Sequence, residues 1–94
     1  MTPEGKVKTK TKKLLADAGA YQFSPQSGIY GRSGVPDIVG CYKGCFFAIE
    51  CKAGKGKTTA LQDRELQNIR DAGGRAIIVN EDTIGEVTSW LKNF

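Results

Sequence analysis

Asp37, Glu50 and Lys52 are the three charged residues whose types and spacing could do chemistry. Residues 45–49, CFFAI, are an apolar run typical of a buried strand, and Glu50 and Lys52 follow it with one residue between them. Side chains alternate between the two faces of a strand, so this carboxylate and this ammonium point the same way at the strand's end. Such a pair is typical either of a surface ion pair or of a metal site with a neighbouring cation.

The register of a predicted hairpin favours the metal site. Asp37 follows Pro36 at the start of the preceding strand, and Lys43-Gly44 reads as a two-residue turn. With that turn Tyr42 faces Cys45, and the same register places Asp37 opposite Glu50. Directly opposed side chains have Cβ atoms about 4.5–5.5 Å apart, so the two carboxylates would repel each other. A divalent cation such as Mg²⁺, which uses one or two carboxylates, removes the conflict.

The elements that must position these residues can be placed from hydrophobic periodicity and turn residues. Residues 4–18 read as a helix, although the alternation KVKTKTKK also fits a strand. The last helix is predicted to begin at Thr83, with Glu86 completing a capping box. The remaining predicted elements are strands at 21–24, 36–41, 45–52 and 75–79 and a helix at 59–72. The predicted order is therefore α-β-β-β-α-β-α, which indicates a mixed sheet flanked by helices.

Composition limits the classes of function that remain. The 94 residues predict one domain, 1–94, and the absence of histidine excludes His-activated nucleophiles and His-containing zinc fingers. Five lysines within residues 6–13 and a net charge of +4 fit a polyanion such as nucleic acid, or equally a solvated helix face. No apolar run reaches the length of a membrane span, and three cysteines with no export signal predict reduced thiols and a cytoplasmic protein.

The combination of motifs resembles the PD-(D/E)xK nucleases, and within them the small stand-alone VRR-NUC family of phages and bacteria. The residues that carry the resemblance are Gly34-Val35-Pro36-Asp37, then Ile49-Glu50-Cys51-Lys52, then residues 59–66 with Gln62. Glu4 fits the acidic residue that members carry upstream. The resemblance covers nearly the whole chain and implies a restriction-endonuclease-like α/β fold.

The resemblance also implies roles. Asp37 and Glu50 would hold Mg²⁺ or Mn²⁺ together with the backbone carbonyl of Cys51, and Lys52 would orient the attacking water. Gln62 and Glu4 would complete the catalytic set, although Gln62 is equally well explained as an ordinary polar residue at a helix start. The implied substrate is DNA, the implied activity that of an endonuclease selective for branched or four-way-junction DNA, and the implied assembly a homodimer.

Residues around this set give weaker signals. Lys55 and Lys57 lie in a glycine-rich loop beside it and are expected to contact DNA phosphates, with solvated side chains as the alternative. Arg32 and Tyr30, in the loop before Pro36, are candidates for substrate contact or equally ordinary loop residues. The sequence GKGKTT is not a phosphate-binding Walker loop, because that motif needs a glycine five positions before Gly56. Two sets are expected in the core: the cysteines Cys41, Cys45 and Cys51, and the aromatic residues Tyr21, Phe23 and Trp90.

Two other functions fit the same sequence. One is a non-catalytic nucleic-acid-binding module on the same fold, since a fold does not fix a function. The other is an interaction module whose basic face contacts an acidic protein. Intact Asp37, Glu50 and Lys52 favour the nuclease, because a decayed site would lose its carboxylates first.

Overall fold

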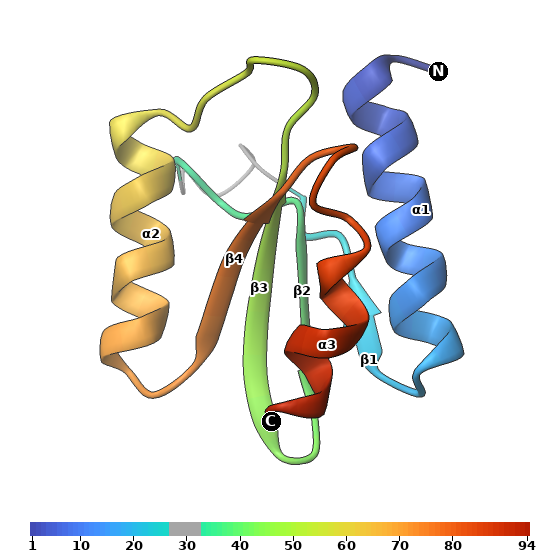
Figure 1. Ribbon diagram of the computed structural model, residues 1–94. Helices are drawn as coiled ribbons and strands as arrows, with labels where there is room; N and C mark the ends of the chain where they lie inside the picture. Colours follow the sequence, from blue (N-terminus) through green and yellow to red (C-terminus); the bar gives the residue numbers. More distant parts are fainter. Residues whose placement is uncertain (27–32) are drawn as a thin grey trace.

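The computed structural model describes residues 1–26 and 33–94, and its element order is the predicted one (Figure 1). The prediction of an α/β fold with a mixed sheet flanked by helices is therefore confirmed. The helices and strands, in chain order, are α1 Pro3–Asp17, β1 Tyr21–Phe23, β2 Ile38–Tyr42, β3 Cys45–Cys51, α2 Ala60–Asp71, β4 Arg75–Val79 and α3 Glu86–Lys92.

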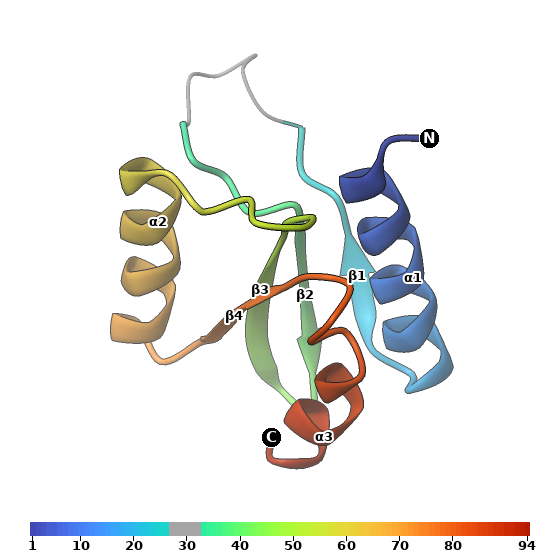
Figure 2. The same cartoon turned by 45° about the horizontal axis from the view of Figure 1, so that its top comes forward.

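The four strands form one sheet in the order β1-β2-β3-β4. The pairs β1–β2 and β2–β3 are antiparallel, whereas β3 and β4 are parallel and are joined by the crossover helix α2. Strand β3 is thus paired on both sides, which explains why it is the most apolar segment of the chain. Its carboxyl end lies at the same end of the sheet as the first turn of α1 (Figures 1 and 2).

The β2–β3 hairpin has the predicted two-residue turn. Lys43 and Gly44 both have positive φ, at 52° and 78°, as a type I′ turn requires. The turn sets Tyr42 opposite Cys45, and the pairing continues in step to Ile38 opposite Ile49. Because the register carries no bulge, the next pair along it is Asp37 and Glu50, as predicted.

Helices cover both faces of the sheet. Buried side chains of α1 and α3, among them Leu15 and Leu91, pack with Phe47 and Ile49 of β3. Leu66 of α2 packs on the opposite face, against Val39, Ala48 and Ala76. The alternation of β3 therefore assigns its even-numbered residues, Glu50 included, to the face that α2 covers.

Helix starts follow local capping chemistry, and one predicted start is wrong. The Thr59 hydroxyl accepts from the Gln62 backbone and the Gln62 side chain accepts from the Thr59 backbone, so the capping box lies at α2. The one predicted at Thr83 and Glu86 does not form. The Thr83 hydroxyl accepts from the Asn80 backbone N–H instead, at 2.9 Å, and holds a turn. Helix α3 begins only at Glu86.

Several predicted core residues lie at the surface. Cys51 is buried, but Cys41 is exposed, and Tyr21 and Phe23 are 70% and 47% exposed. Tyr21 and Phe23 lie on the edge strand β1, whereas Leu66 of α2 packs on this face against Val39, Ala48 and Ala76 of the other three strands. Trp90 does pack in the core, with its ring 5.8 Å from that of Phe47.

The helices of the described ranges include none with the length and apolar character needed to cross a membrane.

Candidate active site

The site begins with Glu50 at the carboxyl end of β3. The apolar residues before it hold this strand in the middle of the sheet, so the side chain of Glu50 is only 1% exposed. Its Oε2 atom is fully buried and has no hydrogen-bond partner among the described residues. A buried carboxylate oxygen without a donor is unfavourable by about 1–3 kcal/mol, so this atom needs a ligand or a proton.

Asp37 approaches Glu50 from the neighbouring strand. It follows the buried Pro36 and precedes the first residue of β2, one step beyond the last backbone pair of the hairpin, Ile38 and Ile49. Its Oδ2 accepts a hydrogen bond of 2.8 Å from the backbone N–H of Cys51. Its carboxyl group also lies near that of Glu50 and raises the pKa of Glu50. Asp37 is thus held by the backbone on one side and faces the second carboxyl group on the other.

Glu4 reaches the same point from a different layer. It lies in the first turn of α1, where the Thr2 side chain caps the helix by accepting from the Gly5 N–H at 3.0 Å. The buried Thr11 hydroxyl donates to the Val7 carbonyl at 2.8 Å within α1. Val7 and Leu15 of this helix pack in the same core cluster as Cys51 at the end of β3. The predicted helix would have started at residue 4; the extra residue Pro3 suits a first helical position.

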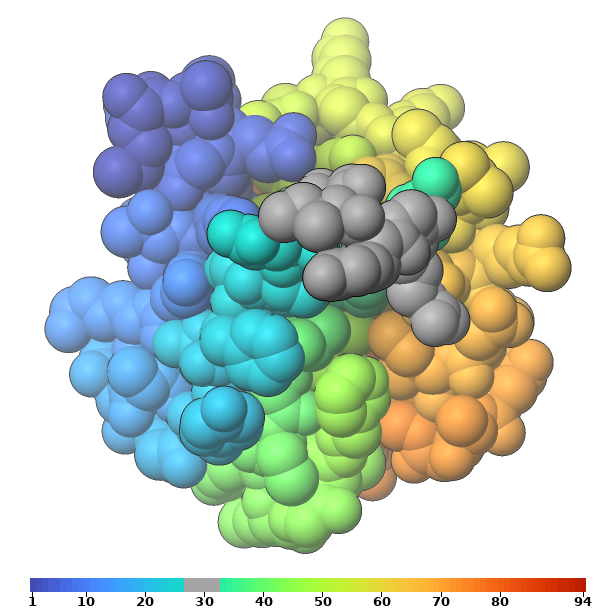
Figure 3. All heavy atoms as spheres, turned by 180° about the vertical axis from the view of Figure 1, so that it is seen from behind, coloured from blue at the N-terminus to red at the C-terminus, as the bar shows by residue number. Residues whose placement is uncertain are grey.

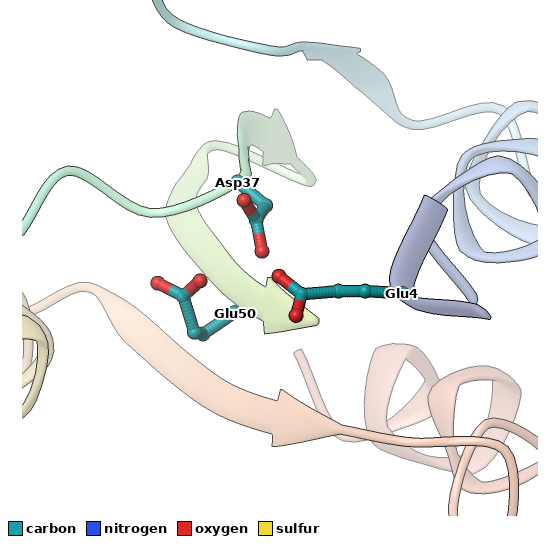
Figure 4. Close-up of side chains that lie close together, drawn as sticks. All are labelled: Glu4, Asp37 and Glu50. Carbon is teal, nitrogen blue, oxygen red and sulfur yellow. The ribbon is translucent and has the colours of Figure 1, made fainter. Parts of the chain in front are cut away.

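The three carboxyl groups form one cluster. One oxygen each from Glu4, Asp37 and Glu50 lies within 4.8 Å of the others. Figure 4 shows that they come from α1, from the segment before β2 and from the end of β3. The structure therefore brings together three of the five residues predicted to be catalytic, from parts of the sequence that are far apart.

The electrostatics of the cluster are those of crowded carboxyl groups. Burial, hydrogen bonding of protonated Glu50 to the Asp37 carboxylate and the negative charge of Asp37 together raise the pKa of Glu50 to about 8, and Glu4 adds to the effect. The positive charge of Lys52 acts in the opposite direction. Without a cation, Glu50 therefore holds a proton at neutral pH, because two close carboxylates resist ionising together.

This donor set fits a hard divalent cation. Mg²⁺ and Mn²⁺ prefer oxygen ligands, and the cluster offers carboxylate oxygens from three residues, one of them buried and without a partner. A cation there would satisfy the free oxygen of Glu50 and offset the repulsion by Asp37. The residues present therefore fit the predicted ion.

The other predicted site residues lie around the cluster. Lys52 directly follows β3 and is half-buried, and its backbone N–H donates to Val79 at 2.9 Å. Cys51 donates its backbone N–H to Asp37; the role of its carbonyl as a metal ligand stays a prediction. Burial raises the pKa of the Cys51 thiol to about 12, so the thiol itself is unreactive.

Gln62 is engaged in the helix cap. Its side-chain oxygen accepts from the backbone N–H of Thr59 at 2.9 Å, which gives it a structural task at the start of α2. It does not belong to the cluster of three carboxyl groups. A catalytic role for Gln62 remains a prediction.

The loop between β3 and α2 lies at the same end of the sheet (Figure 1). Ala53 of this loop lines the open pocket beside the cluster. The Gly54 N–H donates to the Glu81 carboxylate at 2.6 Å, which fixes the loop against the segment after β4. Lys55 and Lys57 are exposed on it and remain predicted DNA contacts. Arg32 and Tyr30 fall outside the described residues.

Gly34 allows the segment that leads to Asp37 to pass close to α2. It has φ +77°, and a Cβ there would lie 2.6 Å from the backbone oxygen of Leu61. Only glycine fits both constraints. The GVPD motif thus contains a glycine for close packing, a buried proline and then the site aspartate.

Lys8 is a neighbour of the cluster that sequence reasoning did not single out. An open pocket of about 540 Å³ is lined by α1 residues, among them Glu4 and Lys8, and by Asp37. The signal in the sequence was the helical spacing: Lys8 is four residues after Glu4 and so lies on the same face of α1.

Comparison with known proteins identifies the fold. No protein-family profile matches the chain, and no curated protein sequence matches it. A solved structure described as a VRR_NUC domain superposes with a TM-score of 0.77, over 100% of this chain and 99% of that one. This protein has the fold of a VRR_NUC domain. The two sequences are 22% identical, and the similarity shows the VRR_NUC fold that the motifs predicted.

Proposed function

We propose that this VRR_NUC-fold protein is a DNA endonuclease that hydrolyses phosphodiester bonds with Mg²⁺ or Mn²⁺. The observation that carries the proposal is the carboxyl cluster, in which one oxygen each from Glu4, Asp37 and Glu50 lies within 4.8 Å of the others. The buried Glu50 also has an oxygen, Oε2, without a hydrogen-bond partner among the described residues. A buried carboxylate close to other carboxylates destabilises the folded state. Its presence at a strand end therefore indicates a functional site.

Each residue has a task that follows from its position. Asp37, Glu50 and Glu4 would hold the ion, which supplies positive charge to the phosphodiester and lowers the pKa of water. The ammonium of Lys52, close enough to act on the pKa of Glu50, would orient the attacking water and offset charge that develops on the phosphate. The Cys51 backbone keeps Asp37 in place through its N–H.

A cleavage assay tests the activity. Labelled four-way-junction, linear duplex and single-stranded DNA would be incubated with the wild-type protein, Asp37→Ala and Lys52→Ala, in Mg²⁺, Mn²⁺ or EDTA. We expect metal-dependent cutting by the wild-type protein that is lost in both variants. Cutting in EDTA, or cutting that survives Asp37→Ala, would contradict the proposed site.

The alternative is a non-catalytic nucleic-acid-binding module on the same fold. Its distinguishing property is affinity for DNA that does not depend on divalent ions, with no cutting of any of the three substrates. The buried, unpartnered oxygen of Glu50 favours the nuclease, because DNA binding alone gives no reason to bury it.

We further propose that the active form is a homodimer selective for four-way junctions. A two-fold dimer would present two sites to opposed strands. Exposed apolar side chains give it a surface: Tyr21, Phe23 and Phe46 are all about half exposed or more and lie on one face of the sheet. Trp90 does not add to this exposed set, because its ring packs against Phe47. Light scattering of the wild-type protein and of Tyr21→Ser/Phe23→Ser, with junction and duplex competing in the cleavage assay, would test both points.

A further inference from the structure

Helix α1 carries a line of charged residues that leads away from the carboxyl cluster. Glu4, Lys8 and Lys12 are four residues apart, so their side chains lie along one face of the helix at a rise of about 6 Å each. Glu4 belongs to the cluster, and Lys8 lines the same open pocket as Glu4 and Asp37. The line therefore begins in the site itself.

Lys12 continues the line to the segment that follows β1. Its ammonium donates to the Ser24 hydroxyl at 3.1 Å, which orients the side chain and leaves two of its three N–H donors for another acceptor. Figure 3 shows α1 in blue beside the cyan residues at the end of β1, on one face of the molecule. Lys8 and Lys12 are both half-buried, in contrast to Lys6, Lys10 and Lys13, which are exposed and line a separate pocket.

Among residues 1–26 and 33–94, neither lysine forms an ion pair with a carboxylate. Within the described ranges the ion pair formed is Lys13–Asp17, at 3.6 Å on the exposed side of the helix. Lys8 is also not the cation that lowers the pKa of Glu50, because Lys52 has that effect. Two cations in line with an acidic site, one of them oriented by a hydrogen bond, suit a ligand with repeated negative charges better than a single small anion.

We propose that Lys8 and Lys12 bind backbone phosphates of the DNA strand as it leaves the carboxyl cluster, and so set the path of the substrate along α1. This inference rests on the proposed function, since it takes DNA as the ligand. Contacts to phosphates fix register and orientation without reading sequence. The pair would act as positioning residues, with Lys8 the nearer to the bond that is cut.

The test measures DNA binding under conditions without cutting. A fluorescein-labelled duplex would be titrated in EDTA, from about 50 to 200 mM salt, with the wild-type protein, Lys8→Ala, Lys12→Ala and Lys8→Arg. Lys10→Ala is the matched control, because it removes the same charge from the same helix on the other side. Thermal unfolding of each variant would confirm that it is folded.

We expect Lys8→Ala and Lys12→Ala each to weaken binding roughly threefold to tenfold and to flatten the plot of log K against log salt by about 0.9 per lost phosphate contact. Lys8→Arg should restore the slope, and Lys10→Ala should leave it unchanged. Equal losses for Lys10→Ala and Lys8→Ala would mean a general charge effect and would overturn the proposal. So would an unchanged slope for Lys8→Ala, or no binding by the wild-type protein.

Failure of this inference and failure of the proposed function give different results. If the wild-type protein cuts DNA in Mg²⁺ or Mn²⁺ but Lys8→Ala and Lys12→Ala bind normally, the path along α1 is wrong and the nuclease stands. If the two variants lose affinity and slope but no protein cuts any substrate, the path stands and the function is that of a binding module.

Discussion

The carboxylate of Asp37 accepts a hydrogen bond of 2.8 Å from the backbone N–H of Cys51, the residue that follows Glu50. One side chain thus closes the open end of the β2–β3 hairpin and sets the distance between two carboxyl groups. The proposed metal site and the last part of the sheet therefore share Asp37, and changes at Asp37 should affect both.

Asp37→Asn and Asp37→Ala separate these two effects. Asparagine keeps an oxygen that can accept from Cys51, whereas alanine leaves that N–H without its partner. We expect both variants to lose stabilisation by Mg²⁺, and Asp37→Ala to be less stable than Asp37→Asn by about 1 kcal/mol or more. Urea unfolding of each, with and without Mg²⁺, measures the difference. Equal stabilities would mean that the hydrogen bond adds nothing to the fold.

Glu50 should make the metal-free protein less stable as the pH rises. Its pKa is raised from 4.5 to about 8 in the folded state, so the folded protein binds a proton that the unfolded chain has released. The stability due to this proton is complete below about pH 4.5 and is lost as the pH rises towards 8, with each pKa unit equivalent to about 1.4 kcal/mol.

The variant Glu50→Gln should remove most of this dependence and raise stability at pH 8 in EDTA. Glutamine keeps the shape of the side chain without its charge. Denaturant unfolding of both proteins between pH 4.5 and 8.5 provides the measurement. A wild-type stability that grows over this range, with the variant parallel to it, would contradict the raised pKa.

Metal affinity should depend on pH because of the same proton on Glu50. An ion that needs ionised Glu50 must displace its proton, so below about pH 8 affinity should rise by up to tenfold per pH unit. Calorimetric titration of Mn²⁺ in two buffers of different ionisation enthalpy would count the protons released, and we expect about one. Lys10→Ala is a suitable control, since it leaves the cluster intact. Binding without proton release would place the ion elsewhere.

Much of this site could be predicted from the sequence because local rules determined it. The turn Lys43-Gly44 sets the hairpin register, and simple counting then pairs Asp37 with Glu50. Glu4 was different, because its approach depends on the packing of α1 against β3. In that packing Val7 and Leu15 share a core cluster with Cys51, and residue spacing along the chain does not predict it. Glu4 was found through a family resemblance.

The wrong predictions have a physical cause as well. Thr83 and Glu86 have the right spacing for a capping box, but the Thr83 hydroxyl accepts from the Asn80 backbone N–H instead of from the start of a helix. The rings of Tyr21 and Phe23 look like core residues in sequence, yet they occupy an edge strand. Local patterns cannot reveal competition from a residue outside the motif, nor which part of a sheet a helix leaves uncovered.

Cys51 and Cys41 should differ sharply towards thiol reagents. Cys51 is buried with its pKa raised to about 12, whereas Cys41 is exposed. In the native protein we expect Cys41 to react fast and Cys51 only at the rate of unfolding. Mass spectrometry of iodoacetamide-treated protein, followed over time with and without urea, would assign each site. Rapid labelling of Cys51 without urea would show that the end of β3 opens readily.

Gly34→Ala tests whether the position of Asp37 depends on the contact between the GVPD segment and α2. A Cβ at Gly34 would lie 2.6 Å from the backbone oxygen of Leu61, which is a steric clash. Either the GVPD segment or the start of α2 would have to move to relieve it. Gly19→Ala is the matched control: Gly19 has a similar φ of +83°, but nothing lies within 4 Å of its Cβ position. Both variants bear the cost of a left-handed backbone, about 1–2 kcal/mol. Only Gly34→Ala should also lose metal binding, since its clash displaces the segment that carries Asp37. Equal effects of the two substitutions on Mn²⁺ affinity would show that the close approach to α2 does not position the site.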